Sequence, residues 1–223
     1  IYFAQNDYSK ALDYFKKSLK LDLSFFGENH PSVASGYYNI GYVYFAQGDY
    51  SKALEYFEEV LKIRLSVYGE NHSRVASVYN DIGEIYSVQG DDFKALDYFK
   101  KSLKIVLSVY GENHSQVSSI YDHIGEIYFA QKDYSKALYY FEESLKIRLS
   151  LFGENHPEVA LSYYSIGSLY IIQGDKSKAL NYYEKSLKIR LSVYGENHPL
   201  TKEIMDLINV ANSKVLQSPE TTK

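Results

Sequence analysis

Residues 33–72 read VASGYYNIGYVYFAQGDYSKALEYFEEVLKIRLSVYGENH, and this stretch decides the fold. Its first part carries one stripe of apolar or small residues, namely Val33, Ala34, Tyr37, Ile40, Gly41 and Tyr44. After the turn QGD comes a second stripe, made of Ala53, Leu54, Phe57, Val60, Leu61, Leu65 and Tyr68. Both spacings are typical of amphipathic helices, so the stretch predicts a helical hairpin that ends before Gly69.

The string GENH recurs every 42 residues, beginning at Gly27, Gly69, Gly111, Gly153 and Gly195. A fixed period of this size is the signature of a repeat protein in which helical hairpins stack. Glycine suits a helix end with left-handed backbone, and the proline after three of the copies suits the first turn of the next helix. We therefore interpret GENH as the turn that ends one repeat and begins the next. We expect neither a metal site nor a catalytic site in its histidines.

Glycines inside the repeat have two further roles. The turn between the two helices carries Gly48, Gly90 and Gly174, where a positive φ is expected, and Lys132 at the equivalent place fits poorly. Within the first helix, Gly41 and its copies are expected to face Ala53 and its copies where two antiparallel helices cross closely. A glycine in a helix interior costs about 1 kcal/mol relative to alanine, so steric access must offset that loss.

The order of these residues resembles the tetratricopeptide repeat. The positions that match are Tyr37, Ile40, Gly41 and Tyr44 in the first helix and Tyr50, Ala53 and Phe57 in the second. The longer period and the Gly-x-x-His-Pro string are similar to kinesin-light-chain-type repeats. The resemblance implies an all-α fold, a right-handed superhelical solenoid of antiparallel helix hairpins, and a non-catalytic role in holding peptides or proteins.

The period also divides the chain into parts. Residues 1–29 are expected to form a truncated first repeat, residues 30–198 four complete repeats, residues 199–217 a C-terminal capping helix and residues 218–223 a disordered tail. A cap is expected because the last hairpin would otherwise expose its packing edge. The chain does not begin with Met, so we expect it to be a piece of a longer protein.

Composition excludes several classes of protein. The 223 residues are 45% hydrophobic and 23% charged, with a formal net charge of −4 and no Cys, which describes a globular chain without disulfides or thiolate metal sites. The acidic balance argues against nucleic acid, and no apolar run approaches the roughly 20 residues that cross a bilayer. Because no catalytic or nucleotide-binding motif occurs, we expect no enzyme activity, no cofactor, no nucleic-acid or membrane partner, and a cytoplasmic location.

The resemblance also assigns candidate binding residues to the face of each first helix that lines the concave groove in this family. These positions differ among the repeats while the apolar stripes do not, which indicates a fixed scaffold with a variable groove. Drift of solvated positions would leave the same variation. The candidates are Tyr38, Asn39, Tyr42, Phe45, Asn80, Asp81, Glu84, Asp122, His123, Glu126, Tyr164 and Ser165.

The charge of these candidates predicts the ligand. Four of them are carboxylates, none is Lys or Arg, and aromatic or apolar residues flank the acidic ones. The basic residues of the second helices are expected in the outer layer, among them Lys62, Arg64, Lys146 and Arg148. We therefore expect a peptide or protein partner that is basic with apolar flanks and is attracted electrostatically.

A structural role is the alternative function. Near-identical repeats and a truncated first hairpin would expose an edge that resembles an internal interface, which favours a homo-oligomer formed by end-to-end contacts. A third possibility, an arm of a larger signalling or enzymatic protein, is compatible with either role.

Overall fold

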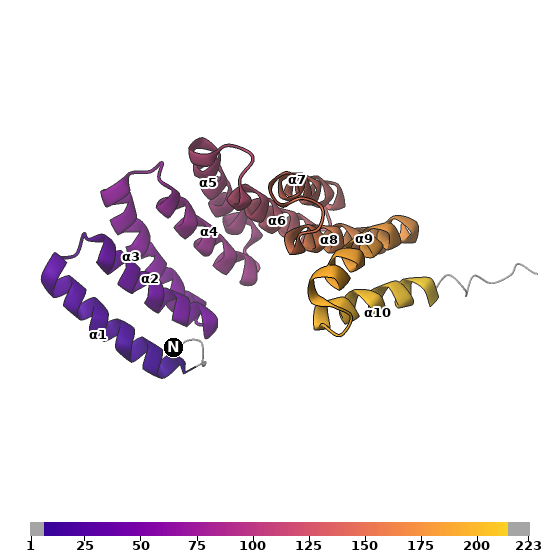
Figure 1. Cartoon of the computed structure of the whole chain (residues 1–223). Helices are drawn as coiled ribbons and strands as arrows, with labels where there is room; N and C mark the ends of the chain where they lie inside the picture. The colour runs from indigo at the N-terminus through magenta and orange to yellow at the C-terminus, as the bar shows by residue number, and fades with distance from the viewer. Residues whose placement is uncertain (1–6, 214–223) are drawn as a thin grey trace, which may run out of the picture. The chain divides into compact units, whose positions relative to one another are not determined.

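The computed structural model describes residues 7–213, which fold into helices joined by short turns without any strand in that range (Figure 1). The chain divides into two compact units, Ile1–Gly111 and Glu112–Lys223. The fold is all-α, as the sequence predicts. Residues 214–217 of the expected capping helix and the expected tail, residues 218–223, lie outside the described residues.

In the first unit, helical hairpins follow one another along the chain. The hairpin of α2 and α3 packs on α1 through α2 and on α4 through α3, and α4 forms the next hairpin with α5. The bounds are α1 (Tyr8–Phe26), α2 (Pro31–Ala46), α3 (Tyr50–Tyr68), α4 (Ser73–Val88) and α5 (Asp92–Tyr110).

The second unit repeats this organisation. Two hairpins, α6 with α7 and α8 with α9, pack on each other through α7 and α8, and α10 packs on α9. The bounds are α6 (Ser115–Ala130), α7 (Tyr134–Phe152), α8 (Pro157–Ile172), α9 (Lys176–Tyr194) and α10 (Pro199–Ser213). Between residues 7 and 213, no helix is both long and apolar enough to cross a lipid bilayer.

Each GENH string ends one helix and begins the next. Gly69 ends α3 with a φ of +76° and a ψ of 171°. Only glycine adopts this backbone readily, and it differs from the expected left-handed helical conformation, whose ψ is about +47°. His72 then caps α4, because its Nδ1 accepts a hydrogen bond from the backbone N–H of Arg74 at 3.1 Å. The equivalent Nδ1 contact recurs at His30, His114, His156 and His198, so these imidazoles serve the architecture of the repeat.

The turn inside each hairpin has the expected backbone. Gly48 adopts a φ of +77°, and Lys132 adopts a φ of +63° at the equivalent place. Asp49 follows the glycine and caps α3, since its Oδ1 accepts a hydrogen bond from the backbone N–H of Lys52 at 3.3 Å. The sequence therefore predicts both the position of this turn and the strained lysine in it.

The closest neighbour of the first-helix glycine is an aromatic ring, and the expected alanine is among the nearest groups at Gly167, where the backbone oxygen of Ala179 would lie 3.3 Å from an added Cβ. A Cβ placed on Gly83 would lie 2.8 Å from Cε1 of Phe99, and a Cβ on Gly125 would lie 2.7 Å from Cε1 of Phe141. Real Cβ atoms do not approach a ring this closely, so only glycine fits. The alanine of the second helix is buried as well, but the close approach that excludes a side chain is made by the ring one turn further along.

This crossing fixes which face of a first helix enters the core. In α2, Ile40 and Val43 are fully buried, and Ile40 belongs to the same core cluster as Phe57 and Val60 of α3. Two other faces of α2 stay accessible on either side of this buried stripe. One face carries the predicted binding residues, and the other carries tyrosines such as Tyr37.

Candidate functional site

The predicted residues of α2 form an aromatic row in the first unit. The ring centroids of Tyr38 and Tyr42 are 6.4 Å apart, and those of Tyr42 and Phe45 are 6.3 Å apart. Tyr42 is 45% exposed and Asn39 is also exposed, whereas Tyr38 and Phe45 are half-buried. The row therefore presents apolar surface at Tyr42, and its neighbours hold that ring in place.

Arg64 of α3 reaches this row, which corrects its expected place in the outer layer. Its guanidinium lies 5.3 Å from the ring centroid of Tyr38. It also donates to the backbone carbonyl of Arg74 at 2.7 Å and to the hydroxyl of Ser77 at 2.9 Å. The arginine side chain thus spans from its own helix to α2 and α4.

The predicted residues of α4 form a polar cluster. Nδ2 of Asn80 donates a hydrogen bond to Oε1 of Glu84 at 2.6 Å. Oδ1 of Asn80 and Oδ2 of Asp81 are buried, and neither accepts a hydrogen bond from any of residues 7–213. The α4 cluster therefore holds two acceptors that the described part of the chain leaves unsatisfied.

Burial raises the pKa of Asp81 to about 7, and the carboxylate of Glu84 adds to the rise, while Tyr38 and Arg64 oppose it. Burial likewise raises the pKa of Tyr38, and the nearby Asp81 adds to that rise. The structure thus brings Tyr38 and Asp81 together from successive first helices. At neutral pH the Asp81 carboxyl is not a permanent negative charge, because its pKa lies close to the pH.

In the second unit, Asp122 of α6 is paired with Arg148 of α7. Nη2 of Arg148 lies 2.7 Å from Oδ2 of Asp122 and 3.0 Å from Oε2 of Glu158 in α8. Nη1 donates a hydrogen bond to the hydroxyl of Ser162 at 2.8 Å. The Arg148 side chain is only 5% exposed, so this ion pair is buried. Burial raises the pKa of Asp122, and the Arg148 guanidinium opposes that rise.

The expectation that Arg148 lies in the outer layer and leaves Asp122 free is therefore wrong. The guanidinium neutralises that carboxylate within the candidate site. Lys146 does lie at the surface, where its Nζ is 3.7 Å from Oε2 of Glu143. Lys62 likewise pairs at the surface with Glu59 of its own helix.

The remaining candidates of α6 lie next to each other on one helical turn. Nδ1 of His123 is 3.9 Å from Oε2 of Glu126. His123 is half-buried, whereas the Glu126 side chain is 68% exposed. Glu126 is therefore an accessible negative charge on this face, and an exposed pair of this kind contributes little to stability.

Tyr164 of α8 lies under a third arginine. The Arg190 guanidinium is 5.1 Å from the Tyr164 ring centroid and donates to Oε2 of Glu203 at 3.2 Å, while the Tyr164 hydroxyl donates to Oε1 of Glu203 at 3.2 Å. Burial raises the pKa of Tyr164, and Glu203 adds to the rise. Ser165 is half-buried beside it.

One position of the repeat accounts for all three arginines. Arg64, Arg148 and Arg190 occupy the same place in their second helices, and Val106 stands at that place in α5. Each arginine contacts a candidate residue of its own hairpin and the helix that follows the hairpin. Sequence reasoning missed this bridge, although the string KIRL in three of the four complete repeats carries the signal.

We predict that Arg148→Met destabilises the protein by about 3–5 kcal/mol, because it leaves Asp122 buried without its counter-charge. The double variant Arg148→Met with Asp122→Leu should recover much of that loss, since no unpaired charge remains. Urea unfolding measures both effects. Lys146→Met is the matched control at the surface and should change stability by less than about 1 kcal/mol. Equal losses for Arg148→Met and Lys146→Met would contradict the buried pair.

Asp81→Asn tests the raised pKa. The unfolded chain releases the Asp81 proton near the ordinary pKa of about 3.9, whereas the folded chain holds it up to a pKa of about 7. The wild type should therefore lose stability relative to the variant as the pH rises from about 4 to about 7, by up to about 4 kcal/mol. Urea midpoints at several pH values measure this difference.

The matched control for that experiment is Asp97→Asn, which removes an exposed carboxyl from α5. Its stability difference from the wild type should vary by less than about 1 kcal/mol over the same range. A difference for Asp81→Asn that stays constant between pH 4 and pH 8 would show that this carboxyl titrates normally.

Comparison with known protein families and solved structures identifies the same helical repeats. A family model described as tetratricopeptide repeat matches residues 1–66, 32–108, 74–150 and 116–192, which together span most of the chain. A comparison with curated proteins gives no match.

Solved structures show the same fold. BtubC (BKLC) from P. vanneervenii is 17% identical, with a TM-score of 0.75 over 97% of this chain and 95% of that chain. A putative kinesin light chain from Podosopora anserina, with nearly identical TPR-like repeats, is 16% identical, with a TM-score of 0.72 over 86% of this chain and 92% of that chain. Identities this low establish the likeness of the fold alone.

Proposed function

The chain belongs to the tetratricopeptide repeat family, whose repeats generally mediate protein–protein interaction, and from this premise we propose that it binds a peptide or partner protein on its first-helix face. The first-helix face consists of the twelve candidate residues. Those of α2 and α4 form its part in the first unit, and those of α6 and α8 form its part in the second unit. Proteins of this family are typically non-catalytic, and they bind peptide or protein partners.

The observation that carries the proposal lies on α4. Oδ1 of Asn80 and Oδ2 of Asp81 are buried acceptors without a partner among residues 7–213, and each such loss costs about 1–3 kcal/mol. In the hairpin of α6 and α7, Arg148 supplies donors to Asp122. Val106 stands at the equivalent place in α5 and supplies none. The α4 cluster therefore holds acceptors without partners, and a ligand with donors would reach them by displacing the side chains that cover them.

The ligand proposed for this face has a basic centre and apolar ends. Tyr42 and Phe45 provide apolar surface beside the acidic cluster of α4. Because Asp81 is partly protonated and Asp122 is paired with Arg148, the preference for a basic group rests on Glu84 in the first unit and Glu126 in the second. The negative charge is smaller than the sequence suggests, so electrostatic steering should be moderate.

Two matched peptides test the proposal, each with identical apolar ends and either Arg-Arg or Glu-Glu at the centre. Wild-type protein should bind the Arg-Arg peptide more tightly, and its affinity should fall as salt rises because exposed charges are screened. Tyr42→Ala should weaken that binding about five-fold to thirty-fold, which corresponds to about 1–2 kcal/mol for a contact residue. Isothermal titration calorimetry measures these affinities.

Phe93→Ala is the matched control, because Phe93 is an aromatic residue of α5 with 84% exposure that lies outside the first-helix face. Its affinity for the Arg-Arg peptide should equal that of the wild type. Tighter binding of the Glu-Glu peptide, or equal losses for Tyr42→Ala and Phe93→Ala, would refute the proposed face and its charge preference.

Self-association is a second candidate function, and the surface of α1 favours it. Leu21 is 58% exposed, and Phe25 and Tyr14 of the same helix are also exposed. Ile63, at the position equivalent to Leu21 in α3, is 3% exposed. Among the described residues, the α1 surface thus exposes side chains at positions that are buried in α3, and a helix of a second copy fits it because the repeats are alike.

Light scattering over a range of protein concentrations tests this second candidate. We predict a mass that increases with concentration for the wild type and a constant monomer mass for Leu21→Lys. A wild type that stays monomeric at high concentration would remove self-association as a function.

A further inference from the structure

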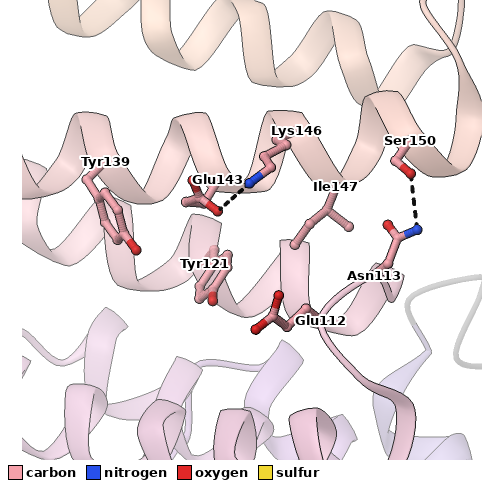
Figure 2. Close-up of a pocket in the computed structure, with 8 residues that line it drawn as sticks. All are labelled: Glu112, Asn113, Tyr121, Tyr139, Glu143, Lys146, Ile147 and Ser150. Atoms are coloured by element: carbon pink, nitrogen blue, oxygen red, sulfur yellow. Dashed lines mark hydrogen bonds and ion pairs between the residues drawn. The ribbon is translucent and has the colours of Figure 1, made fainter.

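A cavity of about 300 Å³ lies in the second unit, and its lining contains none of the first-helix-face residues (Figure 2). The turn that begins α6 contributes Glu112, α6 contributes Tyr121, and α7 contributes Tyr139 and Glu143. Figure 2 shows the Tyr121 ring between the carboxylates of Glu143 and Glu112. The lining therefore combines two tyrosines and two carboxylates with the ammonium of Lys146, which pairs with Glu143.

The tyrosines of this cavity belong to a ring cluster. Tyr140 links them, because its ring centroid is 5.6 Å from that of Tyr121 and 5.2 Å from that of Tyr139. Burial raises the pKa of Tyr121, and Tyr139, Glu143 and Glu112 add to the rise, which agrees with carboxylates facing its hydroxyl. The Tyr139 ring remains accessible, at 57% exposure.

The next hairpin shows what such a cluster binds. Lys185 of α9 stands one repeat after Glu143, and Tyr163 and Tyr182 stand one repeat after Tyr121 and Tyr140. Nζ of Lys185 lies 5.4 Å from the Tyr163 ring centroid and 5.2 Å from that of Tyr182.

The hairpin of α4 and α5 has the same arrangement. Nζ of Lys101 lies 6.0 Å from the ring centroid of Tyr79 and 4.8 Å from that of Tyr98. An ammonium group of the chain itself thus occupies the tyrosine pair in two separate hairpins. Attraction between a cation and the faces of aromatic rings accounts for this position.

In the hairpin of α6 and α7, an acidic residue replaces that internal lysine. The rings of Tyr121 and Tyr140 are arranged as in the other hairpins, but Glu143 stands where Lys101 and Lys185 stand. The α8–α9 hairpin has an equivalent cavity of about 240 Å³, and Lys185 is part of its lining. In the α6–α7 hairpin a carboxylate takes the place of that ammonium in the lining. The change from an ammonium to a carboxylate beside two tyrosine rings favours a cation that comes from outside the chain.

We propose that the cavity formed by Glu112, Tyr121, Tyr139 and Glu143 binds the primary ammonium group of a lysine side chain from a partner protein. The tyrosine faces attract the ammonium, and the carboxylates of Glu112 and Glu143 accept its hydrogen bonds. This site is separate from the first-helix face and does not depend on ligand binding there.

Lys146 does not fill the site. Its side chain is 76% exposed and lies 3.7 Å from Glu143, which makes a weak surface pair that an incoming ammonium can share or displace. In the next repeat, Lys188 occupies the same place as Lys146 and coexists with the internal Lys185. A lysine at position 146 is therefore compatible with a second ammonium over the rings.

The same composition recurs in the hairpin of α2 and α3. Tyr37 and Tyr56 have ring centroids 6.0 Å apart, and Glu59 stands two repeats before Glu143. These residues line a cavity of about 400 Å³. A site-resolved measurement is therefore needed to follow the cavity at Tyr121.

Nuclear magnetic resonance of the intact chain provides that measurement. The probe is the peptide acetyl-Gly-Gly-Lys-Gly-Gly-amide, and its counterpart carries norleucine in place of lysine. The lysine peptide should shift the ring resonances of Tyr121 and Tyr139 in a saturable way, and the norleucine peptide should shift them far less. Equal shifts for both peptides would overturn the proposal.

Glu143→Lys is the decisive variant, because it installs the lysine that the chain already tolerates at positions 101 and 185. The internal ammonium should lie over the two rings as Lys185 does, and its positive charge should lower the affinity for the lysine peptide measured at Tyr121 at least ten-fold. Glu142→Lys is the matched control, since it makes the same charge change at a neighbouring exposed residue outside the cavity, and its affinity should stay within two-fold of the wild type.

Two further results would overturn the proposal. One is an unchanged affinity in Glu143→Lys, checked for correct folding by its urea midpoint. The other is binding of the free diamine cadaverine without binding of the lysine peptide, because the site would then select a small amine and not a protein side chain.

Discussion

The close contact between a first-helix glycine and a second-helix aromatic ring is the constraint on which the rest of each hairpin depends. At Gly83 the ring of Phe99 occupies the space that a side chain would need, so α4 packs on α5 in a rotation that turns this glycine toward the ring. That rotation buries Ile82 and Ile85 and turns Asn80 and Tyr79 to opposite sides of the core stripe. Every complete hairpin thereby has two separate surfaces. One is the first-helix face, and the other, which we call the tyrosine side, carries Tyr37, Tyr79, Tyr121 or Tyr163.

Local geometry could be predicted from the sequence because it depends on residues close together in the chain. The glycine in the QGD turn needs a positive φ, and a histidine or aspartate before a helix finds the backbone N–H groups of the first turn within reach. The helical hairpins follow from the spacing of apolar residues in the same way. The partner of Gly83 could not be predicted, because it depends on how far two helices slide along each other.

The site was harder to predict for a related reason. Helix periodicity assigns a residue to a face by its Cα position, but an arginine side chain extends well beyond its own helix. Arg148 starts on the second helix and ends between Asp122 and Glu158. Its charge therefore belongs to the first-helix face, and a count of acidic and basic residues by helix gives the wrong balance there.

Arginine and lysine are used differently on the two surfaces. On the first-helix face, the planar guanidinium of Arg148 donates to Asp122, Glu158 and Ser162 at once, which a compact ammonium could not do. On the tyrosine side, the ammonium of Lys185 sits between two rings as a point charge. Where Val106 replaces the arginine, the acceptor atoms Oδ1 of Asn80 and Oδ2 of Asp81 have no partner among the described residues. Where Glu143 replaces the lysine, Tyr121 lines a cavity. In most hairpins an arginine or a lysine of the chain itself interacts with these acceptors and rings. Where the chain has Val106 or Glu143 instead, the remaining acceptors and rings favour a group that carries hydrogen-bond donors or a positive charge.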